Sequence, residues 1–230
     1  MILVGTSLSV YRRPPHRKRD DDLDPRRLQS LLDATVANPW QRLTEMHVHN
    51  QPWVPYTDRG ALGALQHVTA HQSKELVGQV ELRGPGDEPV EGRISTYTGM
   101  SARVFAPDRF VTDQEQTRAV AKQLIALMPE NATAVVSTEE LSDFHLAELP
   151  RPFEDWPWLA GVTAEACKPY FSRAVLLATP AVSVEEDAGG RIWIQFYDNL
   201  LDSESPAAKA KMGEVHAYLH AHAQEQWLPF

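Results

Sequence analysis

Histidine pairs at short spacing are the first residues in this 230-residue chain that could do chemistry. His47 and His49 stand two positions apart in "TEMHVHN", so on a strand both imidazoles would lie on one face. Neutral imidazole is a common metal ligand. The pair supports one hypothesis for the chain, a metal-dependent hydrolase that uses His47 and His49.

A second group of histidines lies near the C-terminus, in a stretch that we expect to form a helix at roughly residues 206–224. Because each residue of a helix advances about 100°, His216 and His220 lie about 40° apart around its axis, whereas His222 points about 160° away from His220. The first two could share a metal ion. The alternative is that all three flank an apolar stripe near a helix C-terminus, where partial positive charge is well tolerated.

Other motifs that would indicate catalysis are incomplete. "HVTAH" (67–71) has the spacing of a zinc-protease helix, but Val68 stands where the general base Glu would be. "TGMSA" (98–102) lacks the second glycine of a nucleophile elbow, and the chain has no phosphate-binding glycine loop or dinucleotide fingerprint. Cys167 has no nearby histidine and is expected to be a small core residue. We therefore predict no catalytic residue, no bound metal and no cofactor.

The composition is that of a globular protein with an acidic surface. Hydrophobic residues make up 43% of the chain, and 22 basic against 31 acidic residues give a net charge of −9. Such a balance repels nucleic acid and attracts basic partners. The single cysteine, the strand-like opening "MILVGTSLSVYRR" and the absence of an apolar run of about 18 residues predict a soluble, cytoplasmic protein without a signal peptide.

One segment, "YRRPPHRKRDDDLDPRR" (11–27), has a strong charge bias. Its basic half, Arg12–Arg19, suggests nucleic-acid binding as a third hypothesis. The acidic run that follows directly, Asp20–Asp24, cancels that field within a Debye length of about 8–10 Å. We therefore predict a solvated loop and no nucleic-acid partner.

Runs of strands with a few long helices must position these residues. Asp24 and Pro25 predict the start of a helix over 25–37, and a second helix is expected from Thr112 or Asp113 up to Pro129. A short helical stretch is expected around 63–71, and strands at the N-terminus and at 91–98, 101–106, 132–138, 173–180, 181–187 and 191–199. The last two strands form a hairpin at 188–190. This order predicts a single α+β domain over 1–230, with a mostly antiparallel sheet covered by helices on one side.

Four stretches together resemble a family of immunity proteins from bacterial polymorphic-toxin and type VI secretion systems, those paired with restriction-endonuclease-like toxins. The stretches are "LSVYRR" with "PRRLQSLLDATVANPWQRL", "VFAPDRFVTDQEQTRAVAKQLIALMPENATAVVST", "WPWLAGVT", and "GGRIWIQFYDNLLDSESPAAKAKMGEVHAYL". The resemblance implies a non-enzymatic protein that binds a cognate toxin, a nuclease with a basic surface, and blocks it in the producing cell.

Two acidic loops that contain aromatic residues are the candidate contacts for such a partner. The candidates are Glu154, Asp155, Trp156 and Trp158 in "EDWPW", and Tyr197, Asp198, Asp202 and Glu204 in "YDNLLDSE". The alternative is that the tryptophans are core residues and the acidic loops are only solvated.

Overall fold

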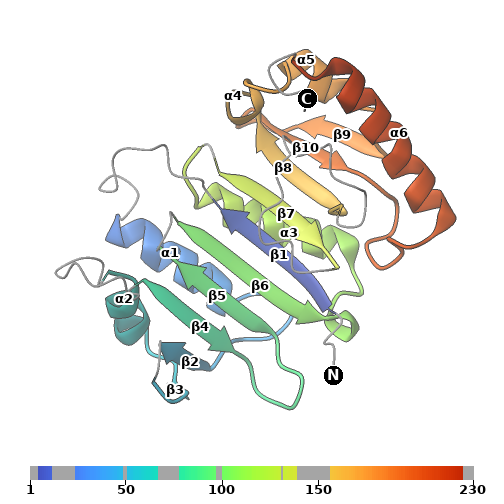
Figure 1. Ribbon diagram of the computed structural model, residues 1–230. Helices are drawn as coiled ribbons and strands as arrows, with labels where there is room; N and C mark the ends of the chain where they lie inside the picture. Colours follow the sequence, from blue (N-terminus) through green and yellow to red (C-terminus); the bar gives the residue numbers. More distant parts are fainter. Residues whose placement is uncertain are drawn as a thin grey trace. The chain divides into compact units, whose positions relative to one another are not determined.

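A computed structural model describes residues 5–11, 24–48, 51–66, 78–96, 100–130, 132–138 and 156–224, the first range by its backbone alone (Figure 1). The chain divides into two compact units, Met1–Pro129 and Glu130–Phe230. Each unit contains antiparallel strands and helices, which confirms the predicted α+β class. Two compact units can form one domain or two, so the single domain over 1–230 stays a prediction.

The first unit contains an antiparallel sheet with the strand order β3-β2-β4-β5-β6-β1. Its strands are β1 (Gly5–Tyr11), β2 (Glu45–Val48), β3 (Val54–Pro55), β4 (Gln79–Arg83), β5 (Glu91–Ser95) and β6 (Ser101–Pro107). The strands expected at the N-terminus, at 91–98 and at 101–106 are therefore confirmed as β1, β5 and β6.

Four helical elements are described in the first unit, and the two longest begin where the capping residues predict. The four elements are α1 (Pro25–Val36), α2 (Asp58–Gln66), the short 3-10 helix η1 (Asp108–Phe110) and α3 (Gln114–Ala126). The Asp24 side chain accepts a hydrogen bond from the backbone N–H of Arg26, with Pro25 as the first helical residue. Asp113 caps α3 through the N–H groups of Glu115 and Gln116.

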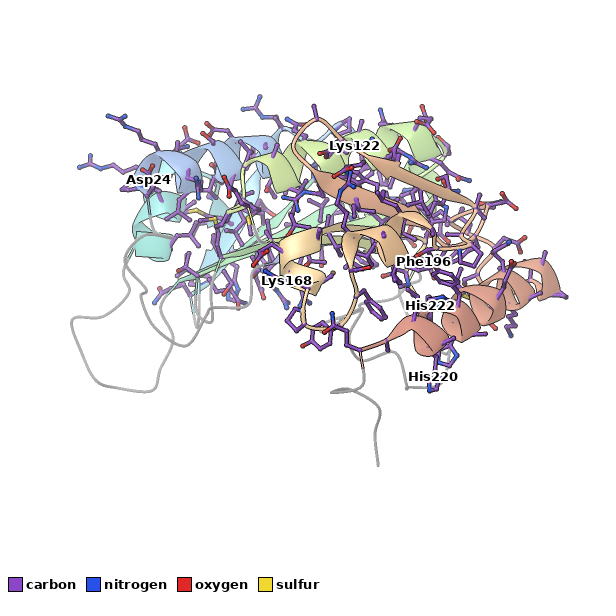
Figure 2. All side chains as sticks on the ribbon, turned by 90° about the horizontal axis from the view of Figure 1, so that it is seen from above. Asp24, Lys122, Lys168, Phe196, His220 and His222 are labelled. Carbon is purple, nitrogen blue, oxygen red and sulfur yellow. The ribbon has the colours of Figure 1, made fainter. Side chains whose placement is uncertain are left out.

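One face of this sheet forms the core of the first unit. Val80, Leu82, Ile94 and Val104 are fully buried, and α1, α2 and α3 contact the strands. Figures 1 and 2 show α1 and α3 on one side of the sheet, as predicted. The strands alternate, so the opposite face carries polar side chains.

The second unit contains an antiparallel sheet with the strand order β7-β8-β10-β9. The strands are β7 (Thr133–Ser137), β8 (Leu159–Thr163), β9 (Ser183–Glu186) and β10 (Arg191–Gln195), and the helices are α4 (Ala164–Cys167), α5 (Arg173–Leu177) and α6 (Pro206–His222). The hairpin predicted at 188–190 joins β9 to β10, with Gly190 at a φ of 76°. The C-terminal helix is also confirmed.

The strand predicted at 173–180 is wrong, because Arg173–Leu177 forms helix α5. The Ser172 side chain accepts a hydrogen bond from the N–H of Val175 and so caps this helix. A run as short and apolar as "AVLLA" has no period that separates strand from helix. The cap and the packing of Leu176, which is fully buried, select the helix.

Strand β10 is the centre of the second unit's core. Every residue from Arg191 to Tyr197 is buried. Arg191 donates to the carbonyl of Ala132 at 2.6 Å and to that of Glu130 at 3.3 Å. Burial lowers the pKa of this guanidinium, an effect that the nearby Asp187 carboxylate opposes.

Candidate partner-binding site

Strand β10 leads directly into residues 198–205, which we call the acidic loop. Tyr197 is buried immediately before the loop, and Leu200 is buried within it. The side-chain amide of Gln195, itself buried, donates to the carbonyls of Tyr197 and Asp198 at 3.0 and 3.2 Å. The start of the loop is therefore attached to the core of the second unit.

Hydrogen bonds within the acidic loop hold its remaining backbone. The Asn199 side chain accepts the N–H of Leu201 at 3.1 Å, and its carbonyl accepts the N–H of Asp202 at 2.9 Å. Ser205 donates its N–H to the carbonyl of Asp202 at 3.1 Å and caps α6 through its side chain. These consecutive turns give the loop a defined conformation before any partner binds.

The acidic loop contains exposed carboxylates and one exposed apolar side chain. Asp198, Asp202 and Glu204 are all exposed, as expected for partner contacts. Leu201 is 47% exposed and is among the few large hydrophobic side chains exposed in the described part of the chain. Glu204 pairs with Lys209 at 2.7 Å, but both side chains are more than half exposed, so the pair contributes at most about 1 kcal/mol. A cation from a partner can replace Lys209 at little cost.

The structure places the aromatic candidates in the core. Trp156, Trp158 and Tyr197 are 8%, 1% and 1% exposed. Trp156 packs edge-on against Phe196, with ring centroids 4.9 Å apart. These side chains pack the second unit and do not form part of its surface here. Glu154 and Asp155 lie outside the described residues, so their predicted contacts stay predictions.

Cys167 is a buried side chain, as expected. Burial raises the pKa of its thiol to about 12, so the sulfur stays protonated at neutral pH.

His47 lies on β2, on the polar face of the first unit's sheet. Its Nδ1 lies 3.2 Å from Oε2 of Glu81 on β4, directly across the sheet in the strand register. The other carboxylate oxygen of Glu81 pairs with Arg93 at 3.1 Å. The His47 ring stacks on Trp53 at a centroid distance of 5.3 Å, and the Arg83 guanidinium lies 4.2 Å from the Trp53 ring centroid. A carboxylate and an indole thus orient the imidazole.

The structure describes only some of the histidines that were candidates for a metal site. His49 and the "HVTAH" pair, His67 and His71, lie outside the described residues. Within the ranges that the structure describes, no group of three or more His, Cys, Asp or Glu side chains could hold a metal ion. The described helices also include none that could cross a membrane. The Arg12–Arg19 segment lies outside the described ranges too.

Comparisons with protein-family models, with curated proteins and with solved structures found no match for this chain. The resemblance to the immunity proteins therefore stays an expectation that rests on the sequence.

Two features of these sites were missed by sequence reasoning. Leu201 follows the buried Leu200, and nothing in "NLLD" alone shows which leucine faces solvent. Glu81 lies 34 residues from His47 in the chain, so only the register of β2 on β4 brings the two together.

Proposed function

We propose that this chain is a non-enzymatic immunity protein that binds and neutralises a cognate secreted toxin, a nuclease with a basic surface, in the cytoplasm of the producing cell. The observation that carries the proposal is the acidic loop, which contains the exposed Leu201 and three exposed carboxylates within seven consecutive residues, 198–204, on a backbone held by hydrogen bonds. The family resemblance supplies the class of partner.

Electrostatics favours the encounter between such a loop and a nuclease. A nuclease needs a basic surface to hold its phosphate substrate, and the same field attracts a protein with a net charge of −9. Long-range attraction increases the association rate more than it lengthens the life of the complex. Asp198 and Asp202 are placed to contribute to this attraction.

Leu201 supplies the contact that slows dissociation. Exposed apolar side chains among polar residues are common anchors at the centre of protein interfaces. Because the loop is ordered by Asn199 and Ser205, little conformational entropy is lost when it docks. The proposal therefore assigns the carboxylates to steering and Leu201 to anchoring.

Co-expression tests the proposal. The product of the adjacent reading frame is expressed in a sensitive host alone and together with this chain. We expect it to be lethal alone and harmless when this chain is present. A harmless neighbour, or one that stays lethal beside this chain, would contradict the proposal.

A second candidate, a metal-dependent hydrolase, is supported by the His47–Glu81 contact. A carboxylate at Nδ1 is the usual outer-shell partner of a metal-bound imidazole, because it fixes the ring and directs Nε2 toward the metal. The test is metal analysis of protein purified without chelators. Stoichiometric zinc, manganese or iron that is lost in His47→Asn and His49→Asn would support this candidate, and less than stoichiometric metal in the unaltered protein would remove it.

A further inference from the structure

We propose that His216 and His220 form a two-histidine chelate for a late divalent transition metal, with Cu²⁺ bound more tightly than Zn²⁺. This inference goes beyond the proposed function and does not depend on it. The two rings lie on successive turns of α6, with centroids 6.0 Å apart and planes inclined by 40°. Residues four apart on a helix lie on the same face, so both imidazoles can approach one point above α6.

Helix α6 is a suitable platform because its other face is fixed to the second unit. Met212, Val215 and Leu219 are buried beneath it. Lys211 donates to the carbonyl of Pro180, and Tyr218 donates to the carbonyl of Val175, each at 3.3 Å. A pair of ligands on such a helix loses little backbone freedom when it binds a metal ion.

His216 and His220 differ in solvent exposure. His216 is half-buried and lies edge-on to Trp156, with ring centroids 6.4 Å apart. His220 is exposed and projects from α6 (Figure 2). Rotation of the exposed His220 side chain can bring one nitrogen of each ring to about 2.0–2.1 Å from a shared metal ion.

His222 lies outside the chelate because its ring is held on another side of α6. Its Nδ1 lies 2.8 Å from the carbonyl of Tyr218, and its ring stacks on the Tyr218 ring at 4.3 Å. Its position two residues after His220 also directs it about 160° away around the helix. It is therefore a matched control on the same helix.

The two imidazole ligands determine the order of affinity for different metal ions. Two imidazole nitrogens with water in the remaining positions suit Cu²⁺ in a tetragonal geometry, and divalent affinity for nitrogen sites rises from Mn²⁺ to Cu²⁺ and falls at Zn²⁺. We therefore expect Cu²⁺ to bind most tightly, then Zn²⁺, then Mn²⁺.

The experiment titrates the full chain with CuCl₂ and ZnCl₂, and measures bound metal by equilibrium dialysis and tryptophan emission in parallel. We expect His216→Asn and His220→Asn each to lose one equivalent of bound Cu²⁺ relative to the unaltered protein, and His222→Asn to retain it. Bound Cu²⁺ close to Trp156 should also quench part of the emission, and this quenching should disappear in the same two variants.

Thermal melting checks that each variant is folded, and we expect all of them to fold because His220 is exposed and His216 is only half-buried. Equal Cu²⁺ binding in His216→Asn, His220→Asn and the unaltered protein would overturn the proposal. A loss in His222→Asn as large as in the other two variants would also overturn it, because binding would then depend on the helix end and not on the pair.

Discussion

The indole N–H of Trp193 donates a hydrogen bond to the carboxylate of Asp187, with 2.9 Å between Nε1 and Oδ2. The other carboxylate oxygen accepts the backbone N–H groups of Gly189 and Arg191 at 2.9 and 3.0 Å. One side chain therefore closes the β9–β10 turn and attaches it to the middle of β10. Because β10 leads into the acidic loop, the Trp193–Asp187 hydrogen bond helps to hold the strand that carries the proposed binding surface.

The first prediction concerns acid stability and Asp187. Burial acts to raise the pKa of this carboxyl, but the hydrogen bonds from Trp193, Arg191 and Gly189 outweigh it and leave the pKa below its ordinary value. A carboxyl with a lowered folded-state pKa stabilises the protein above its unfolded pKa, about 3.9, and this contribution is lost as the pH falls through the folded value. We expect Asp187→Asn to lower the free energy of unfolding by about 0.5–1.5 kcal/mol at pH 7.

Urea unfolding at pH 7 and at pH 3 checks this prediction. The difference between Asp187→Asn and the unaltered protein should shrink at the lower pH. Asp202→Asn, at an exposed carboxylate of the acidic loop, is the control and should change stability little at either pH. A deficit for Asp187→Asn that stays constant with pH would show that the charge of this carboxyl does not matter.

The second prediction compares two glycines of the second unit. Gly161 on β8 lies opposite Trp193, and a Cβ there would lie 2.7 Å from the indole ring. We expect Gly161→Ala to destabilise the protein by about 1–3 kcal/mol through overpacking. Gly213 lies in α6 with no atom within 4 Å of an added Cβ, so Gly213→Ala should stabilise by about 0.5–1 kcal/mol. Denaturant midpoints should therefore move in opposite directions, and an unchanged midpoint for Gly161→Ala would contradict this packing.

Local capping signals made the long helices predictable. Asp24 followed by Pro25, and Asp113 before α3, satisfy the first N–H groups of their helices through their own side chains, so the information is contained in a few consecutive residues. The stretch Arg173–Leu177 was predicted wrongly because its apolar residues fit either period and its cap, Ser172, is one hydroxyl among many.

The acidic character of residues 198–204 was evident from the sequence, but burial of the aromatic residues was not. The backbone N–H of Trp158 donates to the carbonyl of Val136 at 2.8 Å, and the backbone carbonyl of Trp158 accepts the N–H of Phe196 at 2.9 Å. These partners come from β7 and from the end of β10, far away in the chain. Pairing between distant strands, which composition does not record, places Trp158 in the core.

The third prediction separates binding from stability at Leu201. Because this side chain is 47% exposed, Leu201→Ala should change the free energy of unfolding by no more than about 0.5 kcal/mol. If Leu201 anchors the toxin, the same change should weaken binding by at least about 1 kcal/mol. Val182, 36% exposed in the same unit, is the matched control, and Val182→Ala should leave binding unchanged. Equal affinities for the two variants, measured by calorimetry, would remove Leu201 from the interface.

The most direct test of the central claim is reversal of the charge on the acidic loop. The double variant Asp198→Lys, Asp202→Lys is compared with a control that carries the same change in net charge at Glu115 and Glu165, which are 84% and 82% exposed and lie on α3 and α4. Affinity for the neighbouring gene product and protection of the host are measured for both. We predict that the loop variant binds at least about tenfold more weakly, a loss of about 1.4 kcal/mol, and no longer protects, whereas the control still protects. Equal affinity and equal protection by the two variants would contradict the account.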